Sequence, residues 1–291
     1  MMKILVATDF SPHAERALEH GVALAGVFGG TVELFSSAYI PPTALAAMAT
    51  GMSPGLIQEA RDETHTKLEA LVAKLRGKGV DVSCSSSTDE PSLAICARAR
   101  EIGADLIATG TRGHTGIAHV VFGSIAERVT RLAHCSVLTA HADSPAAGPY
   151  RRVLVPTDFS PDADLALAWA RKLLAKTGGK LVVLHSYDLP ALLTGGAAFA
   201  TPSIQLSLQT AARERLDELK KSLAGTDVET VLAHGRPDLS ILETAESAKV
   251  DLIVMGTRGR TGLAHVVMGS TAERVVRRAH QPVVTLKIPH G

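Results

Sequence analysis

The sequence predicts an α/β protein made of two tandem, doubly wound domains, each with a five-stranded parallel sheet and helices on both faces. Short apolar runs alternate with longer amphipathic segments along the chain, which is the pattern of a parallel sheet with crossover helices. The second half of the chain repeats the first, and 291 residues are enough for about two domains of ordinary size. Both observations favour a duplicated α/β domain.

The repeat is strongest in residues 110–134 and 256–280, where 19 of 25 positions are identical at an offset of 146. A second shared segment, Leu5–Pro12, returns as Leu154–Pro161 at an offset of 149. A period of about 147 residues is far longer than a solenoid unit, so it indicates a duplicated domain.

The domain boundaries follow from this repeat. We predict one domain over residues 1–141 and a second over 150–288. Residues 142–149 read ADSPAAGP, and their small side chains, two prolines and one glycine are typical of a linker.

The elements of the first copy are bounded by residues that start or stop helices. Ser11 is an N-cap followed by proline, and Gly29 with Gly30 ends the first helix. The segment 37–54, rich in Pro, Ala, Met and Gly, is expected to be a mobile loop. Strands are predicted over 4–8, 31–36, 80–86, 104–109 and 136–140, and helices over 12–28, 55–76, 91–102 and 124–134. The second copy repeats the strands near 152–157, 180–185, 227–233, 251–255 and 283–287.

The composition argues against several classes of function. A net charge of +1 gives no general attraction to nucleic acid or to an anionic membrane, and 3% aromatic residues make base-stacking platforms improbable. No run of 18 apolar residues and no secretory signal is seen, so a cytoplasmic location is expected. Cys84, Cys96 and Cys135 form no paired motif and are interpreted as buried, small apolar residues in a reducing compartment.

The chemistry-bearing motif is a glycine-rich loop that follows the fourth strand of each copy. In both copies it reads Gly-x-x-Gly, nine residues, then Gly-Ser. Such a loop running into a helix can surround a phosphate with backbone N–H groups, and the serine can cap the helix or donate to a phosphate oxygen. The arginine within each loop can add positive charge. The loop residues are Gly110, Arg112, Gly113, Gly123 and Ser124, then Gly256, Arg258, Gly259, Gly269 and Ser270.

An aspartate follows the first strand of each copy. Asp9 and Asp158 can accept hydrogen bonds from a ribose hydroxyl or a base amine at the carboxyl edge of the sheet. Each can also form a turn that caps the next helix, and the two roles are compatible.

Catalytic and metal motifs are weak. The loop is neither a Walker P-loop nor Gly-x-Gly-x-x-Gly, and the serines do not stand in Gly-x-Ser-x-Gly. Glu127 and Glu273 can face inward, but pairing with arginines of the same helix is favoured. No histidine shows zinc-ligand spacing, and the repeated His119 and His265 are interpreted as structural or surface residues. We predict no catalytic residue and no metal site.

At these residues the chain resembles the universal stress protein family, in its tandem, two-domain type. The loop motif, the aspartate after the first strand and the helical segment Ala-Glu-Arg-Val match in both copies. The resemblance covers essentially residues 1–141 and 150–288, and its motif is specific.

The resemblance implies a sheet order of 3-2-1-4-5 in each domain and ATP, with or without Mg²⁺, at the crevice. It places phosphates on the glycine loop and on the backbone amides of Ile125 and Thr271. It places Ser37 and Ser186, at the end of the second strand, beside adenine. It also implies that the two domains pack as a pseudo-twofold pair and that the chain forms a homodimer.

One turn differs between the copies. The second copy has Gly235-Arg236-Pro237 before its third helix, whereas the first has Asp89-Glu90-Pro91. Acidic groups near a nucleotide would repel phosphate. We therefore expect two sites with the same phosphate contacts but different affinities, and the second site is the stronger candidate.

Three functions stay open on the sequence. The leading one is a stress-response regulatory protein that binds ATP in each domain with little or no hydrolysis. The second is a slow ATPase or autokinase that uses the loop hydroxyls Thr115, Ser124, Thr261 or Ser270. The third is an interaction module that needs no nucleotide, against which the retained glycines argue.

Overall fold

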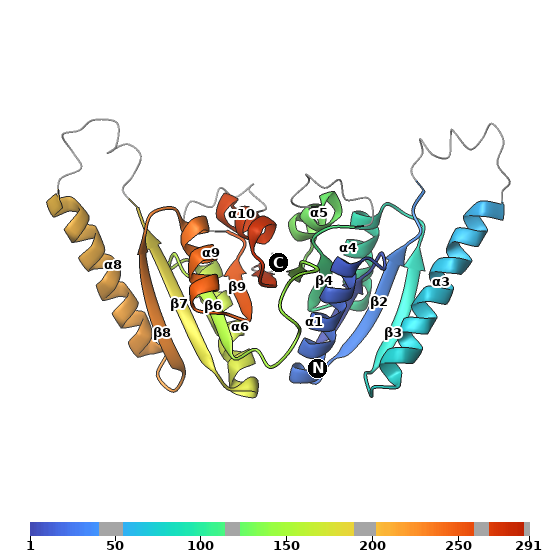
Figure 1. The fold of residues 1–291 in the computed structure, drawn as a ribbon, viewed down its shortest axis with the longest axis horizontal. Helices are drawn as coiled ribbons and strands as arrows, with labels where there is room; N and C mark the ends of the chain where they lie inside the picture. The colour runs from blue at the N-terminus through green and yellow to red at the C-terminus, as the bar shows by residue number, and fades with distance from the viewer. Residues whose placement is uncertain (41–54, 114–122, 189–201, 259–267, 288–291) are drawn as a thin grey trace. The chain divides into compact units, whose positions relative to one another are not determined.

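The computed structural model describes residues 1–40, 55–113, 123–188, 202–258 and 268–287. The chain divides into two compact units, Met1–Gly148 and Pro149–Gly291, and each is described by itself (Figure 1). In the described residues, no helix is both long and apolar enough to cross a membrane. The predicted loop over 37–54 falls mostly on residues outside this description.

Unit 1 alternates strands and helices along the chain. Its strands are β1 (Lys3–Ala7), β2 (Thr31–Ser37), β3 (Val82–Ser87), β4 (Leu106–Gly110) and β5 (Ser136–Ala140). Its helices are α1 (Pro12–Phe28), α3 (Gly55–Arg76), α4 (Pro91–Ile102) and α5 (Ser124–Leu132).

Unit 2 repeats this order of elements. Its strands are β6 (Arg152–Pro156), β7 (Lys180–Tyr187), β8 (Asp227–His234), β9 (Leu252–Gly256) and β10 (Val283–Leu286). Its helices are α6 (Pro161–Thr177), α8 (Pro202–Ser222), α9 (Pro237–Ser247) and α10 (Ser270–Arg278).

Each unit has one parallel sheet with its first strand in the middle. The order is β3-β2-β1-β4-β5 in unit 1 and β8-β7-β6-β9-β10 in unit 2. β1 pairs with β2 on one side and with β4 on the other, so Ala7 lies between Phe35 and Thr109. The strand order reverses at the junction of β1 and β4, and at that of β6 and β9. The predicted fold class and the predicted order 3-2-1-4-5 are confirmed.

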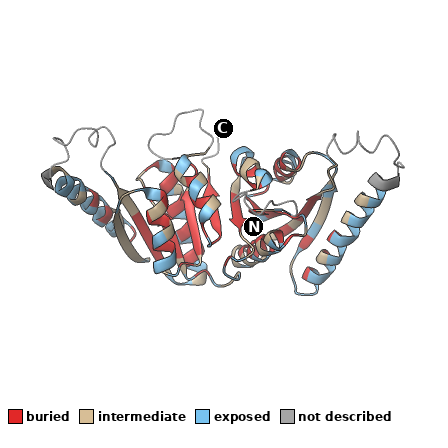
Figure 2. Cartoon of the chain, turned by 45° about the horizontal axis from the view of Figure 1, so that its top comes forward, coloured by how far each residue is buried: buried red, intermediate tan, exposed pale blue. Residues whose placement is uncertain are grey.

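Both faces of the unit 1 sheet are apolar because alternate side chains of a strand point to opposite faces. Ile4 and Val6 face α1, where the helix comes so close that a Cβ on Gly21 would lie 2.9 Å from Val6. Leu5 and Ala7 belong to the core beneath α4 and α5. Figure 2 shows the central strands largely buried, the outer strands β3 and β8 mostly of intermediate burial, and the outer faces of the helices exposed.

Several predicted boundaries differ from the structure by one or two residues, among them the starts of the third and fourth strands, since β4 begins at Leu106 rather than at residue 104. The third strand was expected from residue 80, but β3 begins at Val82. Helix α3 ends in a turn in which the N–H of Val80 donates to the carbonyl oxygen of Leu75, and Gly79 has φ of 80°. This helix-terminating turn occupies the residues that the apolar pattern assigned to the strand.

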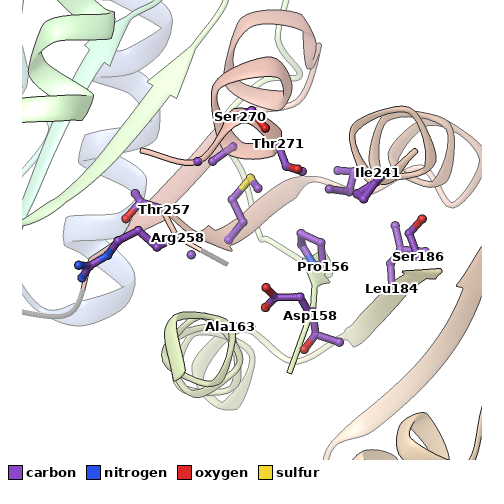
Figure 3. A pocket seen from close by; sticks show the side chains of 16 residues that line it. Pro156, Asp158, Ala163, Leu184, Ser186, Ile241, Thr257, Arg258, Ser270 and Thr271 are labelled. Atoms are coloured by element: carbon purple, nitrogen blue, oxygen red, sulfur yellow. The ribbon is translucent and has the colours of Figure 1, made fainter. Parts of the chain in front are cut away.

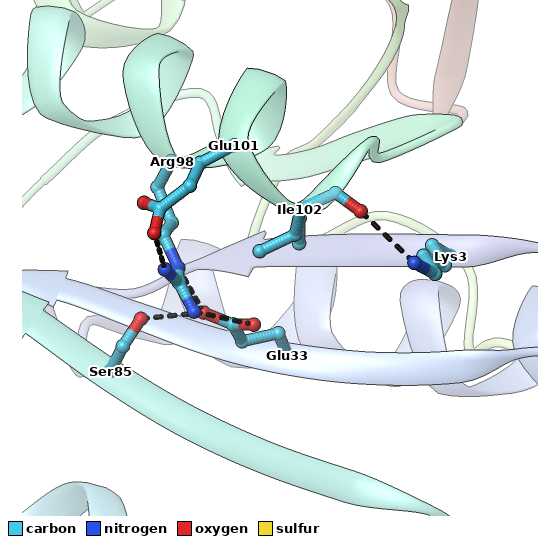
Figure 4. Close-up of polar contacts among 6 residues, drawn as sticks. All are labelled: Lys3, Glu33, Ser85, Arg98, Glu101 and Ile102. Atoms are coloured by element: carbon cyan, nitrogen blue, oxygen red, sulfur yellow. Dashed lines mark hydrogen bonds and ion pairs between the residues drawn. The ribbon is translucent and has the colours of Figure 1, made fainter.

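Unit 1 contains a polar network that unit 2 replaces with smaller and apolar residues. The guanidinium of Arg98 on α4 donates to both carboxylate oxygens of Glu33 on β2, at 2.6 and 3.2 Å, and Ser85 also donates to Glu33 (Figure 4). Arg98 contacts Glu101 as well, at 2.8 Å. The hydrogen bonds to Glu33 and Glu101 raise the pKa of Arg98. The corresponding residues of unit 2 are Val182, Val231, Thr244 and Ser247.

Candidate functional site

The candidate sites lie at the carboxyl ends of the central strands, where the strand order reverses. In unit 1, Asp9 follows β1 and Arg112 follows β4, two neighbouring parallel strands. In unit 2, Asp158 and Arg258 follow β6 and β9 in the same way. Because parallel strands end at one edge of the sheet, the two motifs of each copy are brought together, and α/β sheets bind ligands at this position.

The aspartate of each unit is held in a tight turn between the first strand and the first helix. Asp9 Oδ1 accepts the N–H of Ser11 at 3.0 Å, and the hydroxyl of Ser11 caps α1 by accepting from Ala14. Asp158 accepts from Ser160 in the same arrangement, at 3.1 Å. The capping turn weighed for these aspartates is therefore formed, and it fixes each carboxylate at the edge of the sheet.

A strained residue follows each aspartate. Phe10 and Phe159 have φ of 65° and 60°, a conformation that costs a non-glycine residue of order 1–3 kcal/mol. The N–H of each phenylalanine donates to the threonine hydroxyl two residues earlier, at 3.0 Å. The guanidinium of Arg215 lies 4.2 Å from the Phe159 ring centre, which helps to retain this conformation. Backbone strain recurring at equivalent positions is typical of a functional site.

Two of the loop glycines are required by close contacts within the protein. A Cβ on Gly110 would lie 2.6 Å from the carbonyl carbon of His13, and one on Gly256 would lie 2.6 Å from Cβ of Asp162. Glycine at the end of the fourth strand thus admits the first turn of α1 or α6. A Cβ on Gly113 would lie 2.6 Å from Asp9 Oδ2, so this glycine keeps the loop beside the aspartate.

The base of each loop is closed by one hydrogen bond. The N–H of Gly123 donates to the carbonyl oxygen of Thr111 at 2.7 Å, and the N–H of Gly269 donates to that of Thr257 at the same distance. Residues 114–122 and 259–267, which include Thr115, His119, Gly259, Thr261 and His265, lie outside the described residues.

The helix that follows each loop begins without a side-chain cap. Gly123 and Gly269 are the N-cap residues of α5 and α10, and as glycines they provide no side-chain cap to either helix. Ser124 and Ser270 stand one position further on, so the alternative in which they cap these helices is not realised. The first N–H groups of a helix have no intrahelical partner and carry partial positive charge, which suits an anion.

Each site has a cavity that collects the residues predicted from the sequence. In unit 1 a cavity of about 750 Å³ is lined by Asp9, Ser37, Gly110, Arg112, Gly113, Gly123, Ser124 and Ile125. In unit 2 a cavity of about 270 Å³ is lined by Asp158, Ser186, Gly256, Arg258, Gly269, Ser270 and Thr271. Figure 3 shows Asp158 on one side of this space and Ser270 with Thr271 across from it.

A serine at or next to the last residue of each second strand also fixes the turn beyond the third strand. Ser37 donates to the carbonyl oxygen of Asp89 and Ser186 to that of Gly235, both at 2.6 Å. Each hydroxyl therefore ties the second strand to the turn before α4 or α9, at the rim of the cavity. The cavity floor beside them is apolar, with Phe35 and Ile95 in unit 1.

The acidic residues Asp89 and Glu90 are not among the residues that line the cavity of unit 1, although Pro91 of the same turn is. Glu90 accepts from Ser92 and from the N–H of Leu93 at the start of α4, and it pairs with Arg128 of α5 at 3.1 Å. Partial burial raises the pKa of Glu90, but these hydrogen bonds and the Arg128 charge outweigh it and lower the pKa below its usual value. Asp89 accepts from Ser87 at 2.7 Å. The charges expected to repel phosphate are thus engaged with α4, α5 and β3.

In unit 2 the corresponding turn has its own ion pair. Arg236 donates to the buried Asp238 at 2.8 Å, and Arg274 of α10 lies 3.8 Å from the same carboxylate. Arg128 of α5 and Arg274 of α10 occupy equivalent positions, but their acidic partners do not. Arg128 pairs with Glu90, whereas Arg274 lies beside Asp238.

Two features of the sites were not predicted from the sequence: the apolar floor of the cavities, and the polar position held by His13 in unit 1 and Asp162 in unit 2. His13 and Asp162 are the second residues of α1 and α6, and both contact the loop that follows the fourth strand. Aligning the two copies at offset 149 places these residues opposite each other, but nothing in the sequence marks them as neighbours of Arg112 and Arg258. Among the described residues, no group of three or more His, Cys, Asp or Glu side chains could hold a metal ion.

Comparison with known proteins agrees with this architecture. The model of the universal stress protein family matches residues 1–141 and 149–287. A universal stress protein of Methanocaldococcus jannaschii is 33% identical over 142 residues, which cover 48% of this chain and 84% of that protein. One of Mycobacterium tuberculosis is 27% identical over 311 residues, covering 98% and 95%.

A solved structure has the same fold over the whole chain. A universal stress protein of Archaeoglobus fulgidus superposes with a TM-score of 0.74 at 23% identity, covering 99% of this chain and 96% of that one. Because the family model matches nearly all of both halves, the chain belongs to the universal stress protein family and carries two of its domains in tandem.

Proposed function

We propose that the chain is a regulatory protein that binds one adenine nucleotide, ATP, in each unit, with little or no hydrolysis. One observation carries the proposal. In both units an uncapped helix N-terminus, a glycine segment with an arginine, and a fixed aspartate line the same cavity.

The phosphates would lie at the start of α5 and α10. The backbone amides of Ser124, Ile125, Ser270 and Thr271 belong to the uncapped first turns, and the serine hydroxyls can donate to phosphate oxygens. Arg112 and Arg258 add positive charge at the strand ends. Mg²⁺, if it accompanies the nucleotide, would be held mainly by the phosphate oxygens.

The nucleoside would lie across the ends of the first and second strands. The carboxylate of Asp9 or Asp158 can accept from ribose hydroxyls, as an acidic residue does in other nucleotide-binding α/β folds. The apolar floor formed by Phe35 with Ile95, or by Leu184 with Ile241, suits an adenine ring. The cavity volume of about 750 Å³ in unit 1 is in the usual range for small-molecule sites, and about 270 Å³ in unit 2 lies just below it.

A second candidate function, slow ATP hydrolysis, is supported by one side chain. Glu127 lines the cavity of unit 1, whereas its counterpart Glu273 is not among the residues that line the cavity of unit 2. A carboxylate at the cavity can act as a general base toward water. Hydrolysis, if it occurs, is therefore expected in unit 1 and should be lost in Glu127→Gln.

Equilibrium dialysis with ATP, together with an assay of phosphate release, tests both candidates on the full chain. Binding with a dissociation constant of roughly tens of micromolar or tighter, and phosphate release at background, is expected. No binding at millimolar ATP would contradict the proposal. Steady phosphate release that is lost in Glu127→Gln would replace it with the hydrolytic function. A homodimer, pseudo-twofold packing of the domains, a cytoplasmic location and no nucleic-acid partner stay predictions.

A further inference from the structure

The two sites differ at one polar position beside the loop arginine. The second residue of the first helix is His13 in unit 1 and Asp162 in unit 2. Both stand at the close contact between that helix and the end of the fourth strand, where Gly110 or Gly256 is required. The side chain at this position therefore determines which polar group lies next to Arg112 and Arg258.

In unit 2 the protein itself supplies a counter-charge to the arginine. The Asp162 side chain is only 7% exposed, and its Oδ2 accepts the backbone N–H of Arg258 at 3.1 Å. The same oxygen lies 3.6 Å from Nε of Arg258. The positive end of α6 also favours a carboxylate in its first turn. Much of the Arg258 charge is thus already balanced.

In unit 1 the equivalent side chain is a neutral imidazole. The N–H of Ala142 donates to His13 Nδ1 at 3.1 Å, which requires that this nitrogen carry a lone pair rather than a proton. Burial and the charge of Arg112 lower the pKa of His13, while Asp143 and Asp9 oppose them. His13 therefore supplies no negative charge, and Arg112 Nε is buried with no hydrogen-bond partner among the described residues.

Two charged residues that line the cavities are repeated in both units, because Asp9 corresponds to Asp158 and Arg112 to Arg258. Glu127 also lines the cavity of unit 1, whereas its counterpart Glu273 is not among the residues that line the cavity of unit 2. In the turns that differ in charge, Glu90 and Arg236 are not among the lining residues and are held in ion pairs. The carboxylate of Asp162 is the difference that directly contacts the loop arginine.

We propose that the exchange of His13 for Asp162 makes the two sites differ in their selectivity for phosphate charge. In unit 1, Arg112 is available to a highly charged ligand, so this site favours ATP over AMP more strongly than the unit 2 site does. The inference rests on the proposed function and reverses the order of the sites expected from the acidic turn.

Each site can be measured alone by filling the other cavity. Ser186→Trp places a large side chain in the unit 2 cavity, and Ser37→Trp does so in unit 1. Equilibrium dialysis then gives the ratio of the AMP and ATP dissociation constants for the remaining site. We expect the ratio to be at least about tenfold larger in unit 1, because one uncompensated charge near the phosphates is worth that much or more.

Reciprocal substitutions assign the difference to this position. In the Ser37→Trp background, Asp162→His and the isosteric Asp162→Asn should raise the ratio of the AMP to the ATP dissociation constant at the unit 2 site. In the Ser186→Trp background, His13→Asp should lower the same ratio at the unit 1 site. Asp164→His is the matched control, because it removes an exposed carboxylate two residues away and should leave the ratio unchanged. Circular dichroism checks that each variant is folded.

The outcomes separate this inference from the proposed function. If ATP and AMP bind both sites with equal ratios, or if Asp162→Asn and His13→Asp leave the ratios unchanged, the inference is wrong while nucleotide binding stands. If neither nucleotide binds the unaltered chain, the proposed function fails and the inference fails with it.

Discussion

His20 is a buried histidine of α1 whose ring makes a hydrogen bond to the chain after β5. Its Nε2 lies 3.1 Å from the carbonyl oxygen of Pro145, and because a carbonyl only accepts, Nε2 carries the proton. Burial lowers the pKa of His20 to about 4, against the opposing effect of this hydrogen bond. The unfolded chain binds the second proton more readily, since its histidine pKa is about 6.5.

This shift predicts an acid-dependent loss of stability. The contribution of neutral His20 to the free energy of unfolding is complete above pH 6.5. It is lost as the pH falls toward 4, by up to about 3 kcal/mol. Hydrogen exchange of the α1 amides, followed from pH 7 to 5, should show this dependence in the wild type and much less of it in His20→Leu. His65→Leu, an exposed histidine of α3, serves as the control. Equal pH dependence in wild type and His20→Leu would contradict the account.

Glu33 and Arg98 make a second prediction at the scale of residues. Their side chains are 12% and 27% exposed, and unit 2 uses Val182 and Thr244 at the same places. Removing one partner leaves a poorly hydrated charge, whereas removing both does not. We expect Arg98→Thr to destabilise unit 1 by about 2 kcal/mol and the double variant Glu33→Val, Arg98→Thr to be the more stable of the two. Hydrogen exchange of the slowest β2 amides measures the stability of both variants. If the double variant loses the sum of the stabilities lost in the two single variants, Glu33 and Arg98 are not coupled.

At the scale of elements, the starts of α5 and α10 are central to the proposed function. The N-cap positions are glycines in both helices, with φ of −73°, a value open to other residues. An aspartate at an N-cap accepts from the first helical N–H groups and would occupy the position proposed for phosphate.

Gly269→Asp should therefore abolish ATP binding in unit 2 and leave α10 intact. A Cβ at this position would lie 3.3 Å from the carbonyl oxygen of Thr257, so a small adjustment admits the side chain. Gly269→Ala adds the same Cβ without a cap, and it should retain binding within about threefold. The Ser37→Trp background isolates this site in dialysis measurements. Comparable loss in both variants would point to the steric change rather than to competition for the helix N-terminus.

The sequence predicted the elements well because their boundary signals are local. Ser11 with Pro12 starts α1, and Gly29 ends it in the left-handed conformation that glycine allows. The loop motif and Asp9 were also found in sequence, since both recur in the second copy. The start of β3 was misplaced, because an apolar Val80 reads as strand although it completes the end of α3.

What sequence could not give were contacts between distant segments. The approach of His13 to the loop spans 98 residues, and the ion pair of Glu90 with Arg128 spans 38. Charge alone predicted that the acidic turn weakens the first site, whereas its geometry directs those carboxylates to α4, α5 and β3. The effect of a charged residue on a site depends on its distance from that site, and the local sequence pattern does not contain this distance.

For the molecule as a whole, the duplicated domain leads us to expect two nucleotide sites per chain. Two units repeat the same strand order, the same turn at the first strand and the same uncapped helix after the loop. Each unit is therefore expected to bind nucleotide without a residue from the other. The count of ATP molecules bound per chain tests this expectation directly.

Native mass spectrometry of the full chain titrated with ATP makes that count. We expect two ATP per chain at saturation, and one in Gly269→Asp or in Ser37→Trp. A wild-type chain that binds no ATP, or that never exceeds one per chain at millimolar concentration, would contradict the central claim.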